Sequence, residues 1–145
     1  MTKFLLAVHV LAAIIAIGPV TVAASMFPAA VRQGSAGVHT LYRICRIYAG
    51  VGIAVPVFGL VTAQSMHVLG QIWLIVSMVL TAVAAGVLML LVLPGQEVLV
   101  AALDDGGEVE RRATARLAMY AGMFNLLWAT VTVLMIIRPG STTGA

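Results

Sequence analysis

Four long apolar runs, each free of charged residues, constrain this chain more than any other feature. They extend over residues 4–30, 47–64, 72–93 and 117–137, and none contains Asp, Glu, Lys or Arg. A helix needs about 20 mostly apolar residues to cross roughly 30 Å of hydrocarbon. The sequence therefore predicts an all-α polytopic membrane protein, a four-transmembrane-helix bundle that forms a single domain over residues 1–145.

The composition agrees with this prediction. Of the 145 residues, 62% are hydrophobic and 9% are charged, whereas soluble domains carry about 25% charged residues. A net charge of +3 can indicate nucleic-acid binding in a soluble protein, but here the basic residues mostly flank the apolar runs and indicate topology. We therefore expect this chain to lie in a lipid bilayer and to have no nucleic-acid partner.

The segments between the runs differ in length and charge. Residues 31–46 are polar, and residues 65–71 are a tight connection that predicts an antiparallel hairpin. All five acidic residues lie within 94–116, where residues 104–107, Asp-Asp-Gly-Gly, indicate a turn. Residues 108–116 are expected to begin the last helix in water.

The orientation follows from Lys and Arg near the helix ends, because acidic residues contribute little to the positive-inside rule. The two longer loops, 31–46 and 94–116, carry six arginines, whereas the other side has Lys3 and Arg138. This distribution predicts cytoplasmic loops and outside N- and C-termini.

The first run also has a rival interpretation as a cleavable signal peptide. Lys3 precedes an apolar stretch that is interrupted at Gly18-Pro19 and followed by small residues. Apolar residues continue to Phe27, which favours a retained helix.

Two prolines and one asparagine indicate how the helices pack. Pro19 and Pro56 fall inside helices and tend to kink them. In lipid, helices associate through close packing and interhelical hydrogen bonds. We therefore expect Asn125 to point inward toward Ser77, Thr81 or a freed carbonyl, with a ligand contact as the alternative.

His9 is the clearest ionisable residue inside an apolar run. Burying an imidazole without partners is costly, so such residues are functional-site candidates. His9 shares a helix face with Ala12, Ala13 and Ala16, whose small side chains leave room beside it. Two interpretations of His9 are structural: it hydrogen-bonds a neighbouring helix, or it sits at the headgroup level. Two are functional: it binds a cofactor, or it moves a proton.

His67 lies at the turn after the second run, on the side expected for His9. Two histidines at similar depth can hold a b-type haem, with methionine as an alternative axial ligand. Met66, Met78 and Met135 fall in the same half, although methionines in an apolar chain mostly fill the core. His9 and His67 are therefore the candidate cofactor-binding residues, and haem b is the cofactor that they suggest.

The remaining polar residues have simpler interpretations. Arg43 and Arg46 share a helix face and could clamp an anionic headgroup or a propionate, although such pairs usually anchor topology. Cys45 is an inert small residue or a palmitoylation site in a eukaryote, and a single cysteine excludes an internal disulfide. His39 is an ordinary loop histidine.

No catalytic constellation, phosphate-binding loop, metal-ion motif or buried carboxylate is recognisable in the sequence, which favours a protein that is not an enzyme.

Two stretches of the first run carry a family resemblance. They are Leu5-Leu6-Ala7-Val8-His9-Val10-Leu11 and Phe27-Pro28-Ala29-Ala30-Val31-Arg32. The pattern resembles small bacterial families described as predicted integral membrane proteins and, more remotely, CopD-like copper-resistance proteins and HemJ-type protoporphyrinogen oxidases. In the HemJ type a histidine at the position of His9 is implicated in haem binding, and the basic residues Arg43 to Arg46 are similar. The resemblance covers about half of the chain and lacks the tryptophan and paired glycines usual after that histidine.

Three hypotheses about function follow. The first is a binding or accessory component of the bacterial inner membrane, with a membrane-protein partner or a second copy of the chain. The second is a haem-binding redox protein that uses His9, and the third is a structural subunit of a larger membrane complex.

Overall fold

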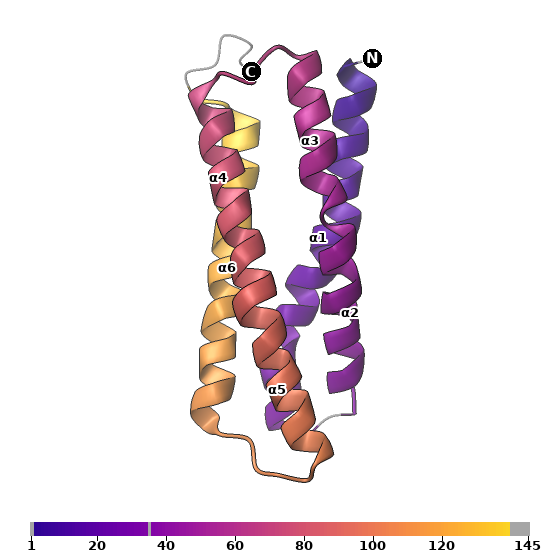
Figure 1. Ribbon diagram of the computed structural model, residues 1–145, viewed down its shortest axis with the longest axis vertical. Coiled ribbons are helices and arrows are strands. Elements are labelled where there is room, and N and C mark those ends of the chain that lie inside the picture. The colour runs from indigo at the N-terminus through magenta and orange to yellow at the C-terminus, as the bar shows by residue number, and fades with distance from the viewer. Residues whose placement is uncertain (1, 35, 140–145) are drawn as a thin grey trace.

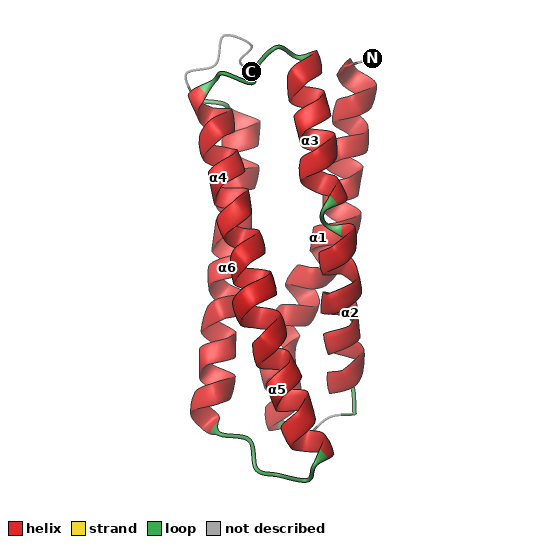
Figure 2. Ribbon diagram, viewed as in Figure 1, coloured by secondary structure: helices red, strands yellow, loops and turns green. Residues whose placement is uncertain are grey.

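The structure, a computed structural model, describes residues 2–34 and 36–139, and these are helical almost throughout (Figures 1 and 2). In chain order the elements are α1 (Thr2–Arg32), α2 (Val38–Val51), α3 (Ala54–Ser65), α4 (Ile72–Val87), the π-helical turn η1 (Leu88–Val92), α5 (Leu93–Asp104) and α6 (Arg111–Ile137). The described residues contain no strand. The predicted all-α class is confirmed.

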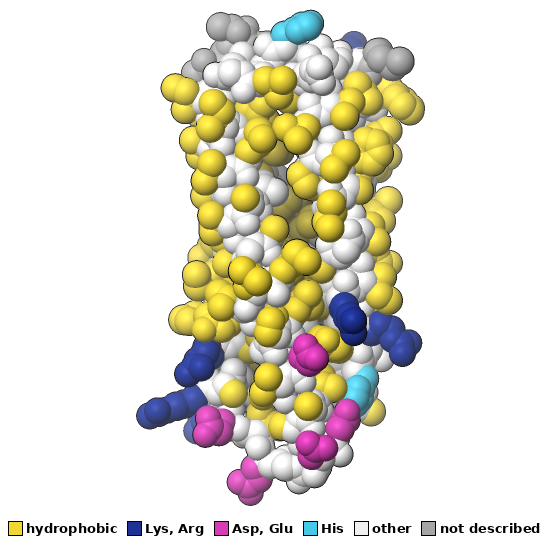
Figure 3. Space-filling model, viewed as in Figure 1, with side chains coloured by type: hydrophobic (Ala, Val, Ile, Leu, Met, Phe, Trp, Pro, Cys, Tyr) yellow, Lys and Arg dark blue, Asp and Glu magenta, His cyan; other side chains and the backbone are white. Residues whose placement is uncertain are grey.

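These elements make four rods that are long and apolar enough to cross a membrane, over residues 2–32, 38–65, 72–104 and 111–137. Their outward faces are strongly apolar. Ile14, Leu90 and Leu126, on three different rods, are 63%, 74% and 71% exposed. A soluble protein rarely exposes so much contiguous apolar surface, and Figure 3 shows it as a broad belt of hydrophobic side chains.

The helices extend beyond the predicted apolar runs. The second rod begins at Val38 instead of residue 47, and the third ends at Asp104 instead of residue 93. The last begins at Arg111, within the residues 108–116 where its start was expected. Backbone hydrogen bonding does not require an apolar side chain, so a helix continues past the hydrocarbon wherever no breaker intervenes. The expected loops 31–46 and 94–116 are correspondingly shorter.

The second rod is interrupted between α2 and α3 because of Pro56. This proline has no N–H to offer the carbonyl oxygen of Gly52, which instead accepts a hydrogen bond from the Val55 N–H at 3.1 Å. The Pro56 ring then stands in the first turn of α3, where no intrahelical donor is needed. The predicted distortion at Pro56 is thus confirmed as a break.

Pro94 has a different effect in the third rod. The chain does not stop before it but widens into η1, whose five residues directly precede α5. A π-helical turn shifts the hydrogen bonding from i−4 to i−5, which accommodates a residue without an N–H. The rod continues, and α5 leans toward α2 (Figure 1).

The bundle consists of two halves. In one half α1 packs against α2 and α3, and in the other α4 packs against α6. The contacts of α1 with α6 and of α2 with α5 join the halves. The hairpin neighbours α3 and α4 therefore each pack on a different partner, and Figure 3 shows the surface hollowed between the two halves.

The main core lies where α5 and α6 meet α1 and α2. Phe27 and Val92 are fully buried there, and Phe124 is 3% exposed. A smaller cluster near the chain termini gathers Ala63, Val68, Trp73 and Leu74. The cluster ties the turn after α3 to the start of α4.

Polar contacts fasten both ends of the bundle. The hydroxyl oxygens of Thr2 and Ser65 lie 2.6 Å apart and join α1 to the end of α3. At the opposite end His39, which was expected in a loop, lies in the first turn of α2. Its Nε2 is 2.8 Å from Asp104 Oδ1, and this contact joins α2 to α5. Both groups of the second pair are exposed, which limits its contribution to about 1 kcal/mol or less.

Candidate functional site

His9 lies in the contact between α1 and α3. Its side chain is 9% exposed, and Nδ1 lies 3.0 Å from the carbonyl oxygen of Val55. The interhelical hydrogen bond anticipated as one reading of His9 is therefore present. A carbonyl can only accept, so Nδ1 must carry the proton and donate it.

Gly59 forms the floor beneath the imidazole ring. A Cβ atom at this position would lie 2.9 Å from His9 Cε1 and 3.3 Å from Nδ1. Such distances are too short for van der Waals contact, so the ring fits only because residue 59 has no side chain. The break at Pro56 and the glycine one turn later together let α1 approach α3.

The hydrogen bond to Val55 also determines what the other ring nitrogen can do. When the imidazole is neutral, protonation of Nδ1 leaves the lone pair on Nε2. Within residues 2–34 and 36–139, His9 Nε2 makes no hydrogen bond. It can accept a hydrogen bond, take up a proton or coordinate a metal, and a backbone carbonyl on Nδ1 is the usual way of orienting such a ligand.

His67 lies outside this site. It is exposed in the turn after α3, with a φ of 58°. It follows Gly59 by eight residues, or roughly 12 Å along a helix axis, so the two candidate cofactor-binding histidines are separated along the bundle.

The methionines proposed as alternative ligands are also dispersed. Met66 and Met135 pack on the small cluster around Trp73, whereas Met78 is 42% exposed. Among the described residues no group of three or more His, Cys, Asp or Glu is placed to hold a metal ion.

Asn125 makes the expected kind of contact with an unexpected partner. Its Nδ2 donates to Ser25 Oγ at 2.9 Å and so links α6 to α1. The hydroxyls of Ser77 and Thr81 instead donate to carbonyls of their own helix, four residues earlier. The expectation that Asn125 faces Ser77 or Thr81 was wrong, because α6 packs on both α1 and α4 and the sequence does not reveal which helix an interior side chain faces.

A second buried polar contact was not anticipated. Gln96 of α5 is 0% exposed, and its Nε2 donates to Cys45 Sγ on α2 at 3.5 Å. Its Oε1 has no hydrogen-bond partner within the described residues. The sequence could have indicated this contact, because Gln96 is a polar residue that follows Pro94 in a long apolar stretch. It was missed because the helix was expected to end at residue 93. The neighbouring Arg43 and Arg46 are exposed, as expected for residues that flank an apolar run.

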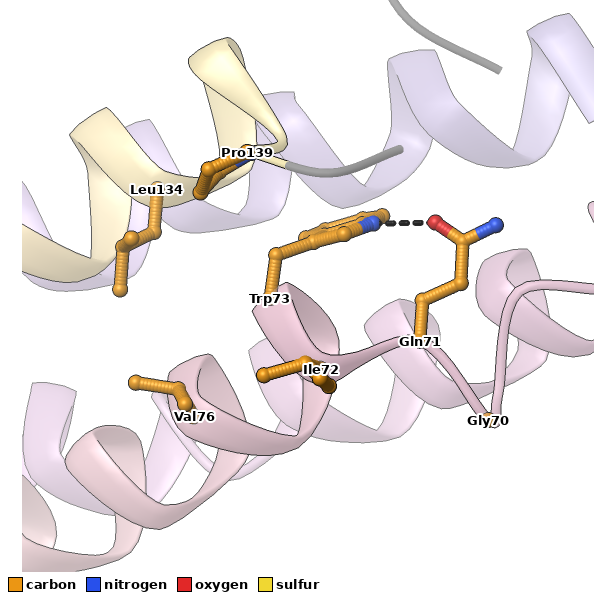
Figure 4. A pocket seen from close by; sticks show the side chains of 7 residues that line it. All are labelled: Gly70, Gln71, Ile72, Trp73, Val76, Leu134 and Pro139. Atoms are coloured by element: carbon orange, nitrogen blue, oxygen red, sulfur yellow. Dashed lines mark hydrogen bonds between the residues drawn. The ribbon is translucent and has the colours of Figure 1, made fainter. Parts of the chain in front are cut away.

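A pocket of about 440 Å³ lies at the end of the bundle near the chain termini (Figure 4). Its lining residues are Gly70, Gln71, Ile72, Trp73, Val76, Leu134 and Pro139. The Trp73 indole donates to Gln71 Oε1, and the Arg138 guanidinium lies 5.6 Å from the centre of the indole ring. Tryptophan and arginine with these contacts are typical of helix ends at a membrane interface.

Comparison of the chain with protein-family models, with curated proteins and with solved structures gave no match.

Proposed function

We propose that this protein is a multi-pass membrane protein that acts as a binding or accessory component, with His9 as the centre of its binding site. Four apolar rods with outward-facing Ile, Leu and Val support the membrane placement. The arginines gathered near one end support an orientation with that end in the cytoplasm and both termini outside. A bacterial inner membrane is the proposed location, following the resemblance of the first helix.

The observation that carries this proposal is the geometry of His9. A histidine that served only to hold two helices together would need one hydrogen bond, and Nδ1 already makes it with Val55 at 3.0 Å. The second nitrogen remains available on an imidazole whose orientation is fixed by that bond and by Gly59. In hydrocarbon this lone pair has no water to bond, so a ligand or partner that donates to it gains more than it would in water.

The experiment compares what co-purifies with the wild type, His9→Ala and His67→Ala. Each protein is extracted in mild detergent, and native mass spectrometry and elemental analysis measure the bound small molecules and metals. His67→Ala is the matched control because it removes an exposed imidazole. A bound species present in the wild type and His67→Ala but lost in a folded His9→Ala variant supports the proposal, whereas equal retention in all three contradicts it.

Haem binding is the second candidate, and the free Nε2 lone pair favours it. His9 could supply one axial ligand, whereas His67 is exposed in the turn after α3. Absorption spectra of the same three proteins, oxidised and reduced with dithionite, test this candidate. A Soret band that is present in the wild type and His67→Ala and absent in His9→Ala supports it, and a featureless wild-type spectrum excludes it for the purified protein.

A structural role in a larger membrane complex is the third proposal. In such a complex the chain would bind a membrane-protein partner or a second copy of itself. The hollow between the two halves supports it (Figure 3). Crosslinking in intact membranes separates it from the others, because a structural subunit is expected to keep its partner in the His9→Ala variant.

A further inference from the structure

A second pocket, of about 380 Å³, lies at the opposite end of the bundle from Trp73, where three segments of the chain meet. These are the end of α1, the end of α5 with the following loop, and the start of α6. The lining residues are Val31, Arg32, Gly34, Leu103, Val109, Arg111 and Thr114. The pocket therefore combines two arginines with three apolar residues, Val31, Leu103 and Val109.

The two arginines come from segments far apart in sequence. Arg32 is in the last turn of α1, and Arg111 is the first residue of α6. Both are exposed, and in the described part of the chain neither forms an ion pair with a carboxylate. A topology anchor requires only that each arginine reach water, and these two in addition line the same pocket.

No acidic residue lines this pocket. The nearest carboxylate in sequence to Leu103 is Asp104, and it is occupied by His39 at 2.8 Å. The Thr114 hydroxyl is also occupied, since it donates to the carbonyl oxygen of Arg111 at 2.8 Å. Glu108 and Glu110 flank Val109 in the same loop but do not line the pocket, and among the described residues neither arginine is paired with a carboxylate.

Guanidinium groups recognise phosphate through paired, charge-assisted hydrogen bonds. The apolar wall of Val31, Leu103 and Val109 continues into the hydrophobic core of the bundle, with Val31 itself 3% exposed. Cations beside an apolar wall at the end of membrane-spanning helices match the headgroup and upper chain region of an anionic phospholipid.

We propose that the pocket between α1, α5 and α6 binds a phosphate group through Arg32 and Arg111. The phosphate comes either from the headgroup of an anionic phospholipid or from a soluble phosphate compound. This site is separate from His9, so its occupancy does not depend on the function proposed for the histidine.

The test measures the thermal unfolding of the full chain in a neutral detergent by intrinsic tryptophan fluorescence. Phosphatidylglycerol, phosphatidylcholine with the same acyl chains, and inorganic phosphate are added in separate titrations. Wild-type Tm is expected to rise with phosphatidylglycerol and not with phosphatidylcholine. If inorganic phosphate reproduces the rise and competes with the lipid, the source is a soluble phosphate; if it has no effect, the source is the lipid.

The variant Arg32→Gln/Arg111→Gln is compared with Arg112→Gln/Arg116→Gln, which removes the same charge from exposed arginines that do not line the pocket. The first variant is expected to weaken binding by about tenfold or more, because charge-assisted hydrogen bonds are lost, while the second binds as the wild type does. Equal weakening in both variants would show a general effect of surface charge and overturn the proposal. So would a wild type that responds alike to both lipids and not to phosphate.

Val109→Trp provides an independent test should the double variant fail to fold. Val109 is only partly buried in the loop before α6, so a larger side chain there fills the pocket while both arginines are kept. Loss of the response to phosphatidylglycerol or phosphate is expected. An undiminished response in this variant contradicts the proposed site.

Discussion

At the scale of single residues, the contact between His9 and Gly59 fixes the geometry of the candidate site. The imidazole is held from one side by the Val55 carbonyl and from below by a residue without a side chain. Neither feature can be relaxed alone, because moving the ring away from residue 59 lengthens its hydrogen bond.

Gly59→Ala is therefore expected to destabilise the protein by about 1–3 kcal/mol, as for other overpacked cores. The new Cβ would lie 2.9 Å from His9 Cε1. Gly86→Ala is the matched control, because nothing lies within 4 Å of a Cβ there. That substitution is expected to be neutral or stabilising by up to about 1 kcal/mol, since alanine favours a helix. Thermal unfolding in detergent measures both.

The double variant His9→Ala/Gly59→Ala shows whether the cause is this contact. With the ring absent, the alanine at position 59 no longer clashes, so the two effects should not add. Strict additivity would mean that Gly59→Ala acts through the helix backbone and not through His9.

The tautomer of His9 is a separate prediction. Because the Val55 carbonyl accepts from Nδ1, the neutral ring should be protonated at Nδ1 and bare at Nε2. Nitrogen-15 NMR of histidine-labelled protein distinguishes the two tautomers, and His9→Ala assigns the signal. A His9 signal with a bare Nδ1 would remove the case for Nε2 as a ligand.

At the scale of elements, the four rods could be predicted from sequence because about 20 apolar residues in hydrocarbon have few alternatives to a helix. The positions at which these helices are interrupted could not be predicted from the sequence equally well. Pro56 breaks its rod at Gly52 and Pro94 does not break its own, because the chain before Pro94 widens into η1. Proline removes the same donor in both cases, so the residue type alone does not determine which outcome follows.

The same reasoning explains which parts of the site escaped prediction. His9 was recognisable as an ionisable residue in an apolar run, but its partners Val55 and Gly59 depend on how α1 and α3 are aligned, which no local pattern encodes. Gln96 was missed because the expected helix ended at residue 93. Where Asn125 points likewise depends on the packing of α6 against two neighbours.

Pro94→Ala tests whether η1 depends on the proline. With an N–H restored, the turn should revert to an α-helix, which rotates α5 by about 100° for each residue of altered register. Gln96 would then leave Cys45, which is 0% exposed behind α5 in the wild type. Cys45 is the single cysteine of the chain, so its labelling by a maleimide in detergent reports this change directly.

Cys45 is expected to react about tenfold or more slowly in the wild type than in Pro94→Ala, because a buried thiol reacts only after local opening. Pro139→Ala, at the end of α6, is the control and should leave Cys45 protected. Unchanged labelling in folded Pro94→Ala would show that helix packing, and not the proline, maintains η1.

At the scale of the whole molecule, charge and shape divide the bundle along its length. The Trp73 pocket, the start of α1 and the end of α6 lie at one end, and the arginine-lined pocket with all five acidic residues lies toward the other (Figures 1 and 3). The two ends therefore offer different surroundings to whatever binds there. His9 lies nearer the end that holds the start of α1, and the proposed phosphate site lies at the opposite end.

Membrane orientation is the prediction that links these ends to compartments. In a Cys45→Ala background, His67→Cys and Glu108→Cys each place a single thiol at an exposed turn, one at each end. The arginine distribution predicts that a membrane-impermeant maleimide labels the His67 variant in intact cells and the Glu108 variant only after permeabilisation, because Lys and Arg are retained on the cytoplasmic side. Labelling in the reverse order would show that the protein has the opposite orientation, with His9 near the cytoplasm. That orientation would change the ligands available to His9 without altering the fold. Labelling of both thiols in intact cells would contradict the membrane-spanning arrangement itself.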